Sequence, residues 1–222
     1  GAIFALEIGV DALLLPFDEE IWSKAQILRS KRKDRLVESS KLEMIEVTVE
    51  SIEDGGMGER VCIDLIERMN PNEGLCVGSF SSCMLLVQAE VNENPHVPPR
   101  PFRVNAGAIH AYVLSEGEKT HYLEELSSGM PVSIISTNGS CRTSSVGRVK
   151  IENRPFLIIR VCSDTGIEGQ ILLQQAETVR LLTPSGSSIA VTSLKIGEKV
   201  LAMTLGSAMH MGKGVPSMAR EV

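Results

Sequence analysis

The sequence predicts an α+β fold, with a short N-terminal α/β remnant followed by a mainly β domain. Over residues 1–35 a helix-like apolar pattern gives way to a continuous apolar run, which is typical of α/β structure. After residue 40 polar and apolar residues alternate, as on half-buried strands. A Gly-x-x-Val unit then recurs about every 70 residues. We therefore expect two domains, 1–42 and 43–222.

The first domain contains a helix-to-strand transition. Residues 2–8 form a short apolar helical stretch that stops at Gly9, and residues 10–15 are a continuous apolar run typical of a buried parallel strand. Asp18 is placed to cap a helix from Glu19 to about Arg32. Because the chain opens inside this pattern, we expect residues 1–42 to be the C-terminal part of a larger α/β domain.

Six basic side chains lie within residues 24–35. They could bind phosphate or nucleic acid, or they could be the solvated C-terminal end of the helix, where positive charge is favourable. The second interpretation is favoured, because the chain as a whole carries a formal net charge of −6. Net acidity argues against a general nucleic-acid-binding protein.

The second domain contains an internal repeat. GERVCIDL begins at Gly58, GMPVSIIS at Gly129 and GEKVLAMT at Gly197, each with Val three residues after the glycine and an apolar stretch following. Residues 115–129 also parallel residues 184–197, with a turn, a short strand and Leu-x-x-Gly. We expect repeated small barrel-like modules at about 58–128 and 129–196, with a truncated third from 197.

Composition excludes several classes of protein and site. No run of 18 apolar residues occurs, so no membrane span is predicted. Five cysteines without a CxxC pair, together with four scattered histidines, predict free thiols in a reducing compartment and no metal site. Residues 54–59 are glycine-rich, but they lack a complete dinucleotide-binding motif.

The segment from Glu90 to Tyr112 combines stiffness with polar chemistry. Four prolines lie at positions 95, 98, 99 and 101, and a stiff loop holds side chains in place at little entropic cost. Arg100 and Arg103 could bind a carboxylate or phosphate, and His110 could exchange protons near neutral pH. Glu90 and Asn105 are further polar candidates. Composition alone leaves a ligand site and a solvated connector equally open.

Two later clusters are also candidates. Arg148, Lys150, Glu152 and Arg154 occur at every second residue, so on a strand they would share one face. That face is either an exposed charged surface or the polar wall of an anion site. Residues 174–178 interrupt an apolar run with polar side chains, which either bind a ligand or form a turn.

Four ordered blocks carry a resemblance to a known family. They are NPHVPPRPFRVNAGAIHAYV from Asn94, THYLEELSSG, VGRVKIENRPFLII and LLQQAETVRLL. Residues 78–178 closely resemble the non-canonical, archaeal-type, NAD-dependent 3-dehydroquinate synthase family, mainly its C-terminal portion. The resemblance implies NAD-dependent oxidative deamination and cyclisation of 2-amino-3,7-dideoxy-D-threo-hept-6-ulosonate to 3-dehydroquinate, a reaction of the alternative shikimate route.

The resemblance also suggests positions for the chemistry. Proton transfer and carbonyl polarisation are needed, and we assign them to His110, Glu90 and Lys150. The substrate-binding positions are Arg100, Arg103, Asn105, Arg148, Glu152 and Arg154. Four further motif members have no assigned role, namely Asn94, Gly107, Gln174 and Glu177. NAD and a small-molecule substrate are the expected ligands, without nucleic acid, membrane or metal, and the oligomeric state is open. The expected location is the cytoplasm, or a plastid if a longer chain carries a transit peptide.

Departures from the family pattern support an alternative. Gln88 stands where a histidine is expected, His96 replaces a tyrosine, and Met209 precedes His210 where an arginine is expected. A catalytically degenerate homologue that binds or senses a metabolite is therefore the second hypothesis.

The third hypothesis is a β-barrel interaction module that binds RNA. It is disfavoured by the net acidity and by the small number of aromatic residues, since single-stranded binders stack bases on aromatic rings.

Overall fold

The computed structural model describes residues 16, 18–24, 41–95 and 97–205, and the backbone of two short strands at 209–210 and 213–214. The chain divides into two compact units, 1–40 and 41–222. In the first unit a helix at 19–24 begins where it was predicted. The Asp18 carboxylate caps it by accepting the backbone N–H groups of Glu20 at 2.9 Å and Ile21 at 3.2 Å. The predicted strand at 10–15 and the basic run beyond Lys24 lie outside the described residues.

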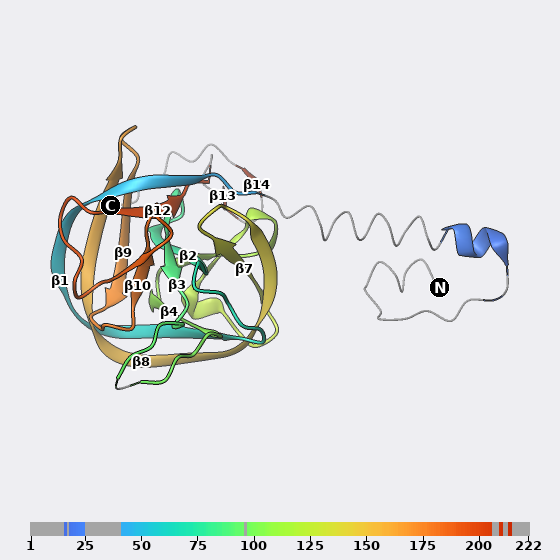
Figure 1. Ribbon diagram of the computed structural model, residues 1–222, viewed down its shortest axis with the longest axis horizontal. Helices are drawn as coiled ribbons and strands as arrows, with labels where there is room; N and C mark the ends of the chain where they lie inside the picture. Colours follow the sequence, from blue (N-terminus) through green and yellow to red (C-terminus); the bar gives the residue numbers. More distant parts are fainter. Residues whose placement is uncertain are drawn as a thin grey trace. The chain divides into compact units, whose positions relative to one another are not determined.

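The described part of the second unit is mainly β, as predicted. The alternating pattern after residue 40 forms one long strand, β1, which continues well beyond the predicted stretch (Figure 1). Two short 3₁₀ turns interrupt the strands, η1 (Glu116–Glu118) and η2 (Leu123–Glu125). The strands are β1 (Met44–Leu65), β2 (Glu73–Phe80), β3 (Cys83–Gln88), β4 (Arg103–Ala108), β5 (Tyr112–Leu114), β6 (Thr120–Tyr122), β7 (Pro131–Ser136), β8 (Cys141–Ser163), β9 (Glu168–Gln174), β10 (Arg180–Leu182), β11 (Ser188–Ala190), β12 (Lys199–Met203), β13 (Met209–His210) and β14 (Lys213–Gly214).

Twelve of these strands form one sheet, and six of them close into a ring. The antiparallel pairs β1–β8, β8–β7, β7–β2, β2–β3, β3–β12 and β12–β1 return to the starting strand. The long strands β1 and β8 pair from Val47 and Ser163 at one end to Leu65 and Val146 at the other. Figure 1 shows both strands curving around the shorter ones. Towards the C-terminal ends of the two long strands, β4 pairs with β1 at Arg60–Asp64 and β9 pairs with β8 at Phe156–Cys162.

The hydrophobic core lies on both faces of the short strands. In β3, Leu85 and Val87 belong to the larger buried cluster, whereas Met84 and Leu86 belong to a second one. Because successive side chains on a strand point to opposite faces, a strand that is buried on both faces reads as a continuous apolar run. This explains why CMLLVQ is buried along its whole length.

The predicted repeats do not form separate modules among the described residues. Gly58 lies within β1, whereas Gly129 and Gly197 precede β7 and β12. Strand β1 pairs with β12 and with β8, so strands from all three predicted copies belong to one sheet. The repeated barrel-like modules are therefore not confirmed.

The cysteines of the described residues are not joined in disulfides. Cys62, Cys76 and Cys83 are buried, and Cys141 and Cys162 are partly exposed. Burial raises the pKa of Cys83 to about 11. In the described part of the chain, no helix has the length and apolar character needed to span a membrane.

Candidate functional site

Three adjacent strands present one polar face. On β1, Arg60, Cys62 and Asp64 alternate with the buried apolar residues Val61, Ile63 and Leu65. Strand β8 places Glu152, Lys150 and Arg148 opposite these three residues, in that order. On the other side, β4 places Asn105 opposite Cys62 and Arg103 opposite Asp64. Side chains from β4, β1 and β8 therefore gather on the face of the sheet opposite the core.

This face forms a cavity of about 210 Å³, which we call the cationic cavity. Five cations and two carboxylates line it, an excess of three positive charges. Such an excess favours a bound anion. Its lining residues are Arg60, Cys62, Glu90, Arg100, Arg103, Asn105, Lys150, Glu152, Arg154, Gln174 and Thr178.

Glu152 is shared by three cations. Its carboxylate lies 2.5 Å from Arg60 Nη2, 3.0 Å from Lys150 Nζ and 3.3 Å from Arg154 Nη2. The Lys150 ammonium, followed by the charges of Arg154 and Arg60, holds the pKa of Glu152 below its ordinary value, against the opposing effect of desolvation. One carboxylate cannot neutralise three cations, so net positive charge remains around it.

Asp64 is the anchor of Arg103 and Arg148. Arg103 donates to both carboxylate oxygens, at 2.6 and 2.8 Å, and Arg148 donates to Oδ2 at 2.9 and 2.5 Å. Burial alone would raise the pKa of Asp64, but these hydrogen bonds outweigh it and hold the pKa below its ordinary value. Two N–H groups of the Arg103 guanidinium are therefore already used in hydrogen bonds to Asp64.

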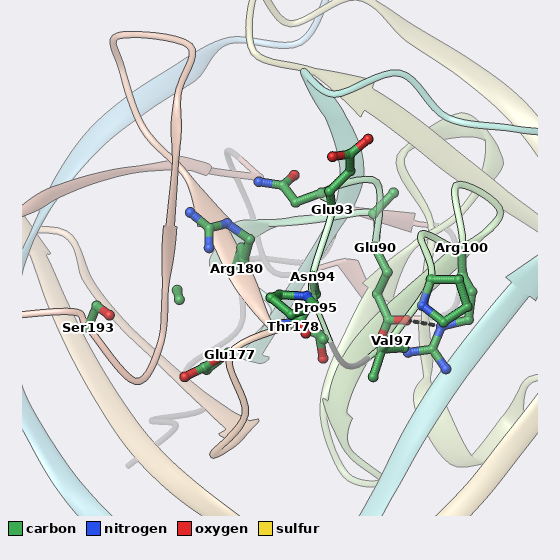
Figure 2. Close-up of a pocket in the computed structure, with 14 residues that line it drawn as sticks. Glu90, Glu93, Asn94, Pro95, Val97, Arg100, Glu177, Thr178, Arg180 and Ser193 are labelled. Atoms are coloured by element: carbon green, nitrogen blue, oxygen red, sulfur yellow. Dashed lines mark ion pairs between the residues drawn. The ribbon is translucent and has the colours of Figure 1, made fainter.

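Glu90 and Arg100 are joined across the proline-rich loop. The Arg100 N–H donates to the Glu90 carbonyl at 2.6 Å, and the Glu90 N–H donates to the Arg103 carbonyl at 2.8 Å. This ladder brings Arg100 Nε to 2.6 Å from Glu90 Oε2, the ion pair that is drawn in Figure 2. Burial raises the pKa of Glu90, and the charges of Arg100 and Arg103 only partly oppose it. Glu90 thus has the environment of a proton-exchanging carboxyl group.

Four buried polar atoms of residues that line the cationic cavity have no hydrogen-bond partner, and two of them, Glu90 Oε2 and Arg100 Nε, lie 2.6 Å apart in an ion pair. The other two are not paired in this way. They are Arg60 Nε and Asn105 Oδ1, in residues that are only 5% and 3% exposed. The Asn105 amide donates to Gln174 Oε1 at 2.8 Å, which fixes its orientation. Buried polar groups are normally paired, so these two atoms are available to a bound ligand.

A second cavity of about 290 Å³ adjoins the first and shares Glu90, Arg100 and Thr178 with it. We call it the loop cavity, because residues 92–95, 97 and 98 of the proline-rich loop form much of its wall. Figure 2 shows Glu93, Glu177 and Arg180 around it. With three carboxylates and two arginines in its lining, it is slightly acidic where the cationic cavity is basic.

The structure brings together most of the site residues that were proposed from the sequence. The individual roles of these residues stay predictions. Eight of them line the cationic cavity, namely Glu90, Arg100, Arg103, Asn105, Lys150, Glu152, Arg154 and Gln174. Asn94 and Glu177 line the loop cavity, and Arg148 reaches the site through Asp64. His110 lines neither cavity; its Nε2 lies 3.1 Å from Ser79 Oγ, and desolvation lowers its pKa.

Sequence reasoning missed three members of this site on β1. Arg60, Cys62 and Asp64 lie within the repeat unit that begins at Gly58, where they were interpreted only as part of a strand. The signal was present, because a cation, a thiol and a carboxylate at every second residue of an apolar strand must share one face.

Gly107 has a structural role at this site. It has φ of +122°, and a Cβ there would lie 2.5 Å from the Leu172 carbonyl oxygen of β9. The Gly107→Ala variant is expected to lose about 3 kcal/mol of unfolding free energy, measured by urea denaturation. Gly129→Ala is the matched control, with φ of +92° in open space, and should lose only about 1–2 kcal/mol. Equal losses in the two variants would contradict the close approach to β9.

The described residues assign no site to a metal or a dinucleotide. No group of three or more His, Cys, Asp or Glu side chains among them could hold a metal ion. Among the described residues no glycine lines either cavity, whereas pyrophosphate groups usually bind to glycine-rich loops at helix N-termini. The donor set of the cationic cavity fits a small anion instead.

The family model and the relatives that match this chain carry the same name. Residues 46–221 match the family model described as 3-dehydroquinate synthase II C-terminal domain. The chain is 42% identical over 220 residues to the 3-dehydroquinate synthase of Methanoregula boonei, an alignment that covers 99% of this chain and 65% of the relative. It is 41% identical over 211 residues to that of Archaeoglobus fulgidus, covering 95% of this chain and 63% of the relative. The chain thus spans less than two thirds of these relatives. No solved structure matches it.

Proposed function

Because the chain belongs to the 3-dehydroquinate synthase II family, we propose that it carries the substrate-binding part of such an enzyme. The proposed reaction is oxidative deamination of 2-amino-3,7-dideoxy-D-threo-hept-6-ulosonate, followed by ring closure to 3-dehydroquinate. NAD is proposed as the hydride acceptor, and no described residue is assigned to it. The archaeal relatives that bear the name 3-dehydroquinate synthase support this proposal.

The observation that carries the proposal is the cationic cavity. The substrate and the product are both carboxylates, and a cavity with three excess positive charges suits an anion of that size. Polyhydroxylated substrates also need polar partners, which Asn105, Gln174 and Thr178 supply.

Glu90 is the proposed proton acceptor. The substrate ammonium must lose a proton before its carbon can be oxidised, and a buried carboxyl with a raised pKa can accept one near neutral pH. Lys150, whose side chain is about half exposed, is the proposed donor to a substrate carbonyl during ring closure. His110 contacts Ser79 and lines neither cavity, so we give it no step.

The alternative of a catalytically degenerate homologue rested partly on Gln88. This residue is buried, donates to the Pro71 carbonyl at 2.6 Å and lines neither cavity. A histidine at the same position would replace a structural contact rather than a cavity group. The departure therefore does not weaken the proposal.

NADH absorbance tests the proposal directly. The 222-residue chain is mixed with NAD and the amino-heptulosonate, alone and together with the N-terminal part of the Methanoregula boonei relative. We expect NADH and 3-dehydroquinate in the combined sample, and binding of 3-dehydroquinate to the folded chain in both. A folded chain that binds neither substrate nor product, and gives no NADH, would contradict the proposal and favour the degenerate homologue.

A further inference from the structure

We propose that Arg60 and Asn105 together recognise a carboxylate that carries a hydroxyl or ammonium group on the adjacent carbon. Arg60 binds the carboxylate with help from Lys150 and Arg154, and Asn105 Oδ1 accepts from the neighbouring donor. This inference rests on the proposed function only for the identity of the ligand. It assigns binding to a residue that the family resemblance did not single out.

The first step is that two of the arginines expected to bind the carboxylate are already compensated. Arg103 donates twice to Asp64, and Arg100 lies 2.6 Å from Glu90. Each has a carboxylate partner that is itself buried, with Asp64 5% and Glu90 7% exposed. An incoming anion would have to compete with these internal ion pairs.

The second step is that most of the uncompensated charge lies around Glu152. Arg60, Lys150 and Arg154 share this one carboxylate, which leaves two positive charges without an anion. Of the three cations only Arg60 is buried, whereas the side chains of Lys150 and Arg154 are 49% and 42% exposed. Water screens an exposed charge more than a buried one, so Arg60 offers the strongest interaction.

The third step is the pair of unpartnered atoms. Arg60 Nε is a donor without an acceptor, and Asn105 Oδ1 is an acceptor without a donor. They lie on neighbouring strands, because β4 pairs Asn105 with Cys62, two residues from Arg60. A ligand that satisfies both atoms must present an acceptor and a donor close together. An α-amino or α-hydroxy carboxylate does this.

The proposed substrate and product both have this group. The amino-heptulosonate carries its ammonium on the carbon beside the carboxylate, and 3-dehydroquinate carries a hydroxyl there. The same Arg60–Asn105 pair can therefore hold the carboxyl end of the molecule at the start and at the end of the reaction. Glu90 lines the same cavity, as a proton acceptor for that end of the molecule must.

Calorimetric titration with 3-dehydroquinate tests the assignment. The Arg60→Gln variant is expected to bind about tenfold to a hundredfold more weakly, since a lost hydrogen bond to a charged group has that effect. Arg60→Lys should recover part of the loss, because it keeps the charge without the planar fork. Arg160→Gln is the control and should bind like the wild type, because Arg160 pairs with Glu53 outside the cavity.

Two further measurements keep the test decisive. If Arg60→Gln does not fold, the Lys150→Gln/Arg154→Gln double variant replaces it, since both side chains are partly exposed, and it should bind several-fold more weakly. The methyl ester of 3-dehydroquinate lacks the carboxylate charge, so its affinity should be low and the same in the wild type and Arg60→Gln. Unchanged affinity of a folded Arg60→Gln variant for 3-dehydroquinate would overturn the proposal.

A second probe separates this inference from the proposed function. Malate is an α-hydroxy carboxylate that is unrelated to the proposed reaction. Wild-type binding of malate that depends on Arg60, without binding of 3-dehydroquinate, would support the recognition pair and contradict the proposed function. Binding of 3-dehydroquinate that depends on Arg100 but not on Arg60 would contradict the recognition pair and support the proposed function.

Discussion

The Glu90→Gln variant is expected to lose about 100-fold to 10,000-fold in kcat for the proposed reaction, the usual contribution of a positioned acid or base. Glutamine keeps the size of the side chain and can still accept a hydrogen bond from Arg100, but it cannot take up a proton. Binding of 3-dehydroquinate should not weaken, because the substitution removes a negative charge from an anion site. Steady-state NADH formation measures the first quantity, and calorimetry measures the second.

The pH dependence of kcat identifies the group responsible. Burial raises the pKa of Glu90, so the carboxylate that accepts the proton is lost as the pH falls through a value above the ordinary range of glutamate. The acidic limb of the wild-type profile should therefore be missing from Glu90→Gln. Glu93→Gln is the matched control, because Glu93 is exposed in the loop cavity, and it should keep the limb. An acidic limb that persists in Glu90→Gln would assign the proton transfer to another group.

Local sequence patterns predicted the parts of this site that depend on local geometry. The alternation from Arg148 to Arg154 predicted one strand face, and these residues lie on β8. The prolines around Arg100 predicted a held loop, and the ladder between Glu90 and Arg100 provides it. Strand period and proline geometry are properties of a few neighbouring residues, so a single sequence is enough to reveal them.

Pairing between distant strands could not be predicted in the same way. Arg60 meets Glu152 across 92 residues, and only the register of β1 against β8 brings them together. The repeated Gly-x-x-Val units show the same limit. Two copies precede strands, whereas Gly58 lies within β1, and the motif does not say which strand will be the neighbour of each copy. Three copies in one sheet therefore resembled three modules. Register depends on the whole hydrophobic pattern of both strands.

Asp64 illustrates how the stability of the protein depends on that register. The Asp64→Asn variant is expected to lose about 3–5 kcal/mol of unfolding free energy, the usual cost of removing one partner from a buried ion pair. Arg103, only 8% exposed, would keep its charge without a carboxylate partner. Urea denaturation near neutral pH measures the loss. Glu53→Gln breaks an exposed ion pair with Arg160 and should cost at most about 1 kcal/mol.

The same carboxylate should make stability depend on acid. Hydrogen bonds from Arg103 and Arg148 hold the pKa of Asp64 in the folded protein below the ordinary value of about 3.9 that it takes in the unfolded chain. Its contribution is therefore fully present above that ordinary value and is lost as the pH falls through the folded pKa. The difference in unfolding free energy between wild type and Asp64→Asn should shrink over this acidic range. A difference that stays constant with pH would show that Asp64 stabilises the fold by packing rather than by its charge.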